Sequence, residues 1–344
     1  MADHNRLLRR ALPVLVAVAA CAGLAGYLLT HRQQWQGLSV QRPALVAVCG
    51  TACLVVLLVP GPIFQLLTSR VGVATGLVES TCLAILTSAI NMVVPLHGGV
   101  AARGVYLKKR YGLELSRFAA TFLGYNILRL CAAAALACGA GLWLLWQQAS
   151  GPDGGQAAAG RGRPVGLLAL VAVSAAMAAA ALATCFVSPA WLERVGMRAH
   201  ATRGLGRDGL TRIPWLRPIV TLHAGWVELT RSPAFLFYVL GLVVLQVLAE
   251  VVMVWAAWNA VGATVSPVAA SLVASFGILT ALTGLTPGGL GLVELVAVGV
   301  GTTVAVSPAH GVAAGLLARG VCLAILGVTA PPAFLWLARR STAP

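Results

Sequence analysis

The stretch Leu285 to Glu294, which reads L-T-P-G-G-L-G-L-V-E, decides how the chain folds. It combines a proline, three glycines and a carboxylate, and long apolar runs continue on both sides. Proline and glycine interrupt helices, and interrupted backbone at membrane depth is tolerated only where protein buries it or where it lines a cavity. A carboxylate near the start of the next helix is costly there unless it has a partner. The stretch therefore predicts the floor of a site inside a membrane protein.

The composition of the whole chain also indicates a membrane protein. Of the 344 residues, 59% are hydrophobic and 10% are charged, and the mean hydropathy is +0.89. Soluble domains carry about 25% charged residues. The net charge of +15 does not indicate a nucleic-acid partner, because Lys and Arg stand in short clusters between apolar runs. Such clusters follow the positive-inside pattern and suit anionic lipid headgroups.

The sequence predicts neither an enzyme nor a metal or cofactor site. The eight cysteines lie within apolar runs and lack the C-x-x-C or Cys/His spacing of a metal site. The chain contains no Walker loop and no H-E-x-x-H or G-x-S-x-G motif. It also offers no polar region long enough for a soluble catalytic domain. The charged residues inside the apolar runs therefore remain the candidates for function.

The pattern of apolar runs predicts an all-α polytopic membrane protein with a single integral membrane domain over residues 1–344. About six runs are long enough for full spans: 11–29, 44–67, 118–146, 165–187, 235–258 and 309–337. The second of these contains Pro60-Gly61-Pro62, which should kink it or end its regular helix. Two further runs, beginning at residues 77 and 265, are broken by proline and glycine and predict re-entrant hairpins.

The positions of the basic residues predict the orientation of the chain. A full crossing at 77–112 would place the basic cluster that follows Gly99 outside the cell, whereas a re-entrant hairpin keeps it inside. Both termini and the basic loop 188–218 then lie in the cytoplasm, and the membrane is the bacterial inner membrane. Residues 219–231 form an interfacial helix in this arrangement.

The two broken hairpins resemble each other. In each, a proline and a pair of glycines end an apolar helix that carries Ser and Thr. Arg129 lies thirty residues beyond Gly99, and Arg319 lies thirty residues beyond Gly289. Transporters use inverted repeats with broken helices to build a substrate site at the membrane midplane. We therefore expect an inverted repeat that pairs residues 77–148 with residues 265–338.

Four ionisable residues lie deepest in the predicted spans: Arg129, Arg319, Glu250 and Glu294. Each costs about 2.5–3.5 kcal/mol on insertion scales, so each marks a site or a buried pair. In a structural interpretation, an arginine pairs with a carboxylate and locks two helices together. In a functional interpretation, one or both guanidinium groups bind a lipid phosphate, and the helix N-termini after Gly99 and Gly289 add backbone donors. The two are compatible, because a substrate can displace a carboxylate.

Two stretches carry a resemblance to a known family. The first is Asn91 to Arg117, N-M-V-V-P-L-H-G-G-V-A-A-R-G-V-Y-L-K-K-R-Y-G-L-E-L-S-R, and the second is Leu285 to Glu294. They resemble the two signatures of the lysylphosphatidylglycerol synthase transmembrane, or flippase-like, family. The residues that match are Arg103 at the basic position of the first signature and, in the second, Pro287, Gly288, Gly289, Gly291 and Glu294. One departure is that Val100, Ala101 and Ala102 stand where the family usually has an acid.

The resemblance implies an inner-membrane protein that moves or handles phospholipids or lipid-linked carriers. In the bifunctional members a soluble domain makes the aminoacylated lipid; the chain stops at Pro344 without such a domain, so lysyl transfer is not expected. The leading hypothesis is a lipid translocase. Its partner is a phospholipid, anionic or aminoacylated, or a polyprenyl-linked lipid, whose phosphate binds Arg129, Arg319 or both. The candidate substrate-binding residues are Arg103, Arg129, Glu250, Pro287, Gly288, Gly289, Gly291, Glu294 and Arg319.

Two alternatives stay open at this point. One is a membrane scaffold or regulatory partner of a lipid-modifying or glycosylation enzyme, with the basic loop 188–218 as its docking surface. The other is a transporter of small solutes or ions, which predicts currents or uptake without lipid movement.

Overall fold

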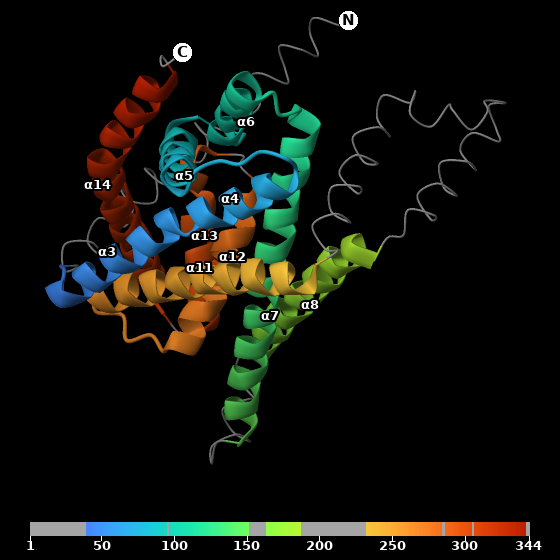
Figure 1. Cartoon of the computed structure of the whole chain (residues 1–344). Helices are drawn as coiled ribbons and strands as arrows, with labels where there is room; N and C mark the ends of the chain where they lie inside the picture. Colours follow the sequence, from blue (N-terminus) through green and yellow to red (C-terminus); the bar gives the residue numbers. More distant parts are fainter. Residues whose placement is uncertain are drawn as a thin grey trace, which may run out of the picture.

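A computed structural model describes residues 39–94, 96–150, 163–186, 232–283, 286–304 and 306–341, and these residues form helices without strands. In chain order the elements are α3 (Pro43–Leu58), α4 (Pro60–Arg70), α5 (Leu77–Val93), α6 (Gly98–Tyr111), α7 (Leu115–Ser150), α8 (Arg163–Phe186), α11 (Pro233–Ala260), α12 (Pro267–Thr283), the 3₁₀ turn η3 (Pro287–Gly289), α13 (Leu292–Thr303) and α14 (Pro308–Ser341). Figure 1 shows their arrangement.

The structure confirms an all-α polytopic membrane protein. Four helical stretches are long and apolar enough to cross a membrane, and they coincide with four of the predicted spans: Pro43–Arg70, Leu115–Gln147, Pro233–Ala260 and Pro308–Arg340. The predicted span 165–187 coincides with α8. The predicted span 11–29, the basic loop 188–218 and the interfacial helix 219–231 lie outside the described residues, so the number of six full spans stays a prediction.

The second predicted span is interrupted where its prolines predict. α3 ends at Leu58 and α4 begins at Pro60, because proline lacks an N–H group and cannot continue the hydrogen-bond ladder. Gly61 follows, and its missing side chain lets α4 approach α5 closely. A Cβ atom on Gly61 would lie 2.3 Å from Oγ1 of Thr81. The Pro-Gly-Pro sequence therefore interrupts the hydrogen-bond ladder, although Val59 keeps helical backbone angles, and Gly61 positions the first hairpin against α4.

The described helices fall into two sets that follow each other at a constant offset along the chain. α3 begins at Pro43 and α11 at Pro233, and the same offset separates the start of α5 at Leu77 from that of α12 at Pro267. α5 and α12 each have 17 residues, and each leads through a break and a shorter helix into a long helix, α7 of 36 residues or α14 of 34. In Figure 1, α7 leads away from α6, whereas α14 runs in the opposite direction to the C-terminus. These matches support the inverted repeat that the sequence predicts.

The two sets of helices exchange partners across the molecule. α5 packs against α14, α12 packs against α7, and α3 packs against α11. Within the second set the packing is also close, because Trp258 of α11 is 2% exposed and a Cβ atom on Gly301 of α13 would lie 2.7 Å from its ring. Each broken hairpin is therefore held by the long helix of the other half.

Both breaks contain residues with positive φ angles, but the residue types differ. In the first, Leu96 and His97 have φ angles of 58° and 57°, in the left-handed region that side chains disfavour. In the second, Gly288, Gly289 and Gly291 supply the positive φ angles of 57°, 72° and 80°. Glycine adopts this region with little strain.

Gly99 closes the first break, and its lack of a side chain is required there. A Cβ atom on Gly99 would lie 2.1 Å from the carbonyl oxygen of Thr87 in α5. The amide of Gly99 also donates a hydrogen bond of 2.8 Å to Oδ1 of Asn91. The short helix α6 is therefore tied directly to the end of α5.

We expect Gly99→Ala to destabilise the purified protein by about 1–3 kcal/mol, because the added methyl group meets a backbone oxygen that cannot turn aside. The measurement is the thermal unfolding midpoint in detergent. Gly139→Ala on α7 is the matched control, since a Cβ atom there meets nothing within 4 Å and alanine favours a helix. Equal midpoints for the two variants would show that the break does not have this geometry.

Candidate functional site

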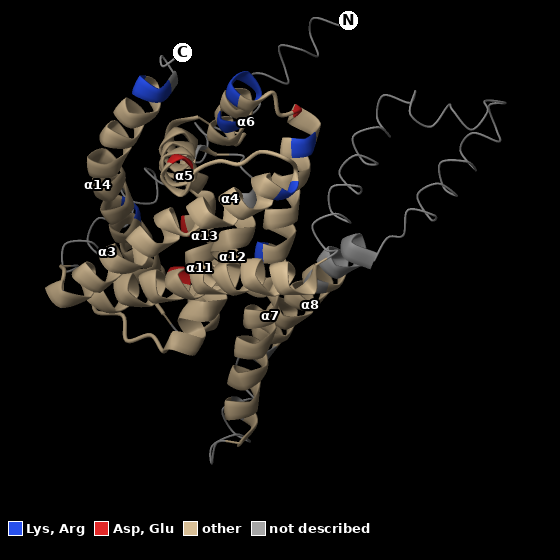
Figure 2. Ribbon diagram, viewed as in Figure 1, with Lys and Arg blue, Asp and Glu red and all other residues tan. Residues whose placement is uncertain are grey.

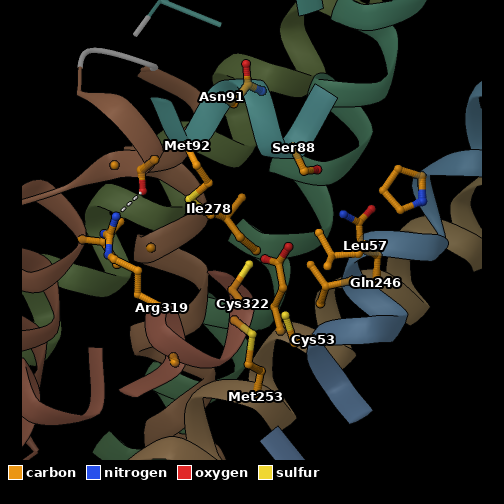
Figure 3. A pocket seen from close by; sticks show the side chains of 18 of the residues that line it. Cys53, Leu57, Ser88, Asn91, Met92, Gln246, Met253, Ile278, Arg319 and Cys322 are labelled. Carbon is orange, nitrogen blue, oxygen red and sulfur yellow. Dashed lines mark hydrogen bonds between the residues drawn. The ribbon is translucent and has the colours of Figure 1, made fainter. Parts of the chain in front are cut away.

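A cavity of about 400 Å³ lies between the two broken hairpins, with walls from α3, α7, α11 and α14. Most of its lining is apolar, and the charged side chains that line it are Arg103, Arg129, Glu250 and Arg319. Figure 3 shows Ser88 and Asn91 of α5 on one side and the sulfur atoms of Cys53, Met253 and Cys322 on another. A largely apolar cavity with a few ionised groups can hold a charged group that is attached to an apolar one.

Two polar pairs join α7 to α11 along one wall of the cavity. The hydroxyl of Tyr125 donates a hydrogen bond of 2.8 Å to Oε1 of Gln246. One turn further along both helices, Arg129 pairs with Glu250 through its Nη2 atom. Residues four apart share one face of a helix, so both pairs point the same way. The structure thus realises the ion pair of the structural interpretation for Arg129, and it adds a second pair that the sequence reasoning missed.

Arg319 of α14 is bound by two residues of the stretch from Leu285 to Glu294, namely Glu294 and Gly288. Its Nη2 and Nε atoms lie 2.8 Å and 3.1 Å from Oε1 of Glu294, and its Nη1 atom donates a hydrogen bond of 3.0 Å to the carbonyl of Gly288. The other carboxylate oxygen of Glu294 accepts a hydrogen bond of 2.8 Å from the amide of Gly291. Glu294 therefore caps α13 and neutralises Arg319 at the same time, which supplies the partner that a buried carboxylate needs.

Arg103 of α6 differs from the other two cavity arginines. Its side chain is buried, with the residue 4% exposed, and its guanidinium carbon lies 4.0 Å from the centre of the Phe64 ring. Within the described part of the chain it makes no ion pair and no hydrogen bond. Its Nε atom is buried without a partner, as is that of Arg129, but Arg129 has Glu250 as a counter-charge. A buried charge without a counter-charge is costly, and the aromatic face offsets only part of that cost.

The backbone amides at the breaks are already engaged. Gly99 donates to Asn91, as described above, and Gly289 donates to the carbonyl of Thr286 at 3.0 Å. Gly291 donates to Glu294. The hairpins use these three amides to hold their own shape. That the helix N-termini following Gly99 and Gly289 add backbone donors for a bound anion stays a prediction. Pro287 belongs to η3, where it helps to form the turn.

Sequence reasoning also missed an ionised cluster outside the cavity, centred on Glu79 of α5. Glu79 is 1% exposed and accepts hydrogen bonds of 2.8 Å from the hydroxyls of Tyr106 and Tyr111. Arg110 of α6 and Arg340 of α14 lie 3.4 Å and 3.5 Å from its oxygens. Burial, with the hydrogen bond to Glu79, raises the pKa of Tyr106, so its hydroxyl stays a donor. Figure 2 shows the basic ends of α6 and α14 at this side of the molecule.

The signals for this cluster were present in the sequence. Glu79 stands inside an apolar run, where a carboxylate needs a partner. Tyr106 and Arg110 are four residues apart on the following helix and so share one face. The cluster joins the first hairpin to the C-terminal end of α14.

We expect Glu294→Gln to lower the stability of the purified protein by about 3–5 kcal/mol, because it leaves the guanidinium of Arg319 buried without a counter-charge. The double variant Glu294→Gln, Arg319→Met should recover much of this loss, since no unpaired charge remains. Glu114→Gln is the control, because the side chain of Glu114 is 70% exposed. Thermal unfolding in detergent measures all three variants. A double variant no more stable than Glu294→Gln alone would contradict the pairing.

The comparisons with known proteins give one match. No curated protein and no solved structure matches the chain significantly. The family model of the lysylphosphatidylglycerol synthase TM region matches residues 11–330, which is most of the chain. The matched region is the membrane part of that synthase and not its catalytic domain. The chain therefore belongs to the family of the lysylphosphatidylglycerol synthase transmembrane region.

Proposed function

We propose that this multi-pass membrane protein translocates a phospholipid or a lipid-linked headgroup across the bacterial inner membrane. The observation that carries the proposal is the cavity between the two broken hairpins, which combines an apolar lining with buried arginines. A headgroup brings charge and hydrogen-bonding groups that need such partners, while the acyl chains need an apolar surface. Membership of a family of lipid-associated membrane domains supports the same class of substrate.

The surface beside the first break suits the acyl chains. Val93 is 76% exposed and Leu96 is 55% exposed, although both are large and apolar. Exposed apolar side chains at membrane depth lie against lipid. In the proposed mechanism the headgroup enters the cavity from this side and the acyl chains remain in the bilayer.

The charge distribution supports an orientation with the cytoplasm at the ends of α6 and α14. Lys108, Lys109 and Arg110 lie in the last turn of α6, and Arg339 and Arg340 in that of α14. Basic residues accumulate on the cytoplasmic side of bacterial membrane proteins. The C-terminus then lies in the cytoplasm, as the sequence predicts. The scaffold alternative depends on residues 188–218, which lie outside the described residues, so the structure offers it no support of its own.

We expect the protein to move fluorescent phospholipid between the leaflets of reconstituted vesicles and Gly277→Trp to abolish most of that movement. Gly277 of α12 lines the cavity, and a Cβ atom there meets nothing within 4 Å, so an indole at this position fills the space that the headgroup needs. The measurement is the loss of inner-leaflet protection when an impermeant quencher is added outside.

The matched control is Gly241→Trp. Gly241 of α11 is exposed, lies outside the cavity lining and has equal room for a side chain. Gly241→Trp should move lipid at the rate of the wild type. If the wild type moves lipid no faster than empty vesicles, or if the two tryptophan variants behave alike, translocation through this cavity is refuted.

A further inference from the structure

The charges around the cavity do not balance. Among the described residues, three arginines and the carboxylate of Glu250 line the cavity. Glu250 is paired with Arg129, and Arg319 is paired with Glu294, which is not itself a lining residue. Arg103 remains, which leaves one net positive charge. His97 and Tyr125 also line the cavity, but neither an imidazole nor a phenol that donates to Gln246 adds a negative charge.

The paired arginines are poor receptors for an incoming anion. A headgroup that took Arg129 or Arg319 would leave Glu250 or Glu294 buried without a counter-charge, and breaking a buried ion pair costs several kcal/mol, about 3–5. Arg319 would also lose its hydrogen bond to the carbonyl of Gly288. An anion that binds Arg103 breaks no ion pair and no hydrogen bond, because Arg103 makes neither among the described residues.

The surroundings of Arg103 prepare it for one anionic group. The guanidinium carbon lies over the ring of Phe64, and such a contact with an aromatic face does not use the N–H donors of the group. The donors along its edge match the oxygens of a phosphate two at a time. Thr286 lines the same cavity with a buried hydroxyl that also lacks a partner within the described residues. Arg103 and Thr286 therefore bring unused hydrogen-bonding capacity to the cavity. The Nε atom of Arg129 is also without a partner, but its guanidinium group is already paired with Glu250.

The repeat explains why the surplus charge lies on one side. The offset that relates α5 to α12 also relates Gly104 to Glu294, so the first hairpin has no carboxylate where the second hairpin carries one. Its neighbour Arg103 brings a cation to the cavity instead. The same offset relates Arg129 to Arg319, and Arg129 must then take its carboxylate from α11. The first hairpin is thus the positive half of the site.

Resting on the function proposed above, we infer that Arg103 binds the phosphate of the headgroup and that the cavity selects lipids with one negative charge. Phosphatidylglycerol is a lipid of this kind. A zwitterionic lipid adds a cation to a cavity that already has a surplus one, and an aminoacylated headgroup adds more. Arg129 and Arg319 stay in their carboxylate pairs and shape the cavity around the headgroup.

The test measures binding to the purified protein in detergent, with dioctanoyl phosphatidylglycerol, dioctanoyl phosphatidylethanolamine and inorganic phosphate as probes. The wild type should bind phosphatidylglycerol at least about tenfold more tightly than phosphatidylethanolamine, and Arg103→Gln should remove that difference. Arg103→Lys should keep part of it, since the charge remains without the planar fork. Lys109→Gln is the control, because it removes a positive charge from an exposed position of the same helix.

A second measurement separates binding from a structural role. Arg103→Met should raise the thermal unfolding midpoint of the lipid-free protein, because it removes a buried charge that has no partner. Arg129→Met should lower the midpoint, because it leaves Glu250 unpaired. If Arg103 were needed only for folding, Arg103→Met would lower the unfolding midpoint, as Arg129→Met does.

The outcomes distinguish this inference from the proposed function. Loss of phosphatidylglycerol binding in Arg103→Gln but not in Lys109→Gln supports the inference, even if reconstituted vesicles show no lipid movement, a result that refutes translocation alone. Unchanged binding in Arg103→Gln overturns the inference, as does a wild type that binds both lipids equally. Inorganic phosphate bound as tightly as phosphatidylglycerol also overturns it, because the site would then serve a free anion.

Discussion

Each ionised group in the apolar interior of this protein needs a partner, and that requirement organises the fold. Glu294 and the carbonyl of Gly288 hold Arg319, which ties the last helix to the second break. The pair of Arg129 and Glu250 ties α7 to α11. Apolar helices can pack in many registers at similar cost, whereas a shifted register would strand a buried charge at a cost of several kcal/mol, about 3–5. The ion pairs therefore select one arrangement and fix the cavity walls.

The sequence predicted the breaks, the long helices and the buried charges because these depend on local chemistry. Proline, glycine and the thirty-residue spacing to Arg129 and Arg319 are visible without a structure. The choice of partners was not, since either carboxylate suited either arginine until the packing of the helices was known. The hydrogen-bond partners of the amides at the breaks could not be predicted for a similar reason. The partner of the Gly99 amide, for example, is the side chain of Asn91, which only the fold brings close.

Arg103 shows what only the tertiary arrangement supplies. Its place in a motif marked it as a candidate, but the motif does not reveal that α4 brings Phe64 beneath its guanidinium group. Nor does it reveal that no carboxylate of the described residues reaches it. The Glu79 cluster has the same character, since Arg340 comes to it from the far end of the chain.

The backbone at the two breaks has a mechanical consequence. Leu96 and His97 are held in left-handed conformations that cost about 1–3 kcal/mol each, while the glycines of the second break adopt such conformations at almost no cost. The first hairpin therefore stores conformational energy that the second does not. A change of backbone conformation that relaxed Leu96 and His97 would recover that energy, and the second break holds no such reserve.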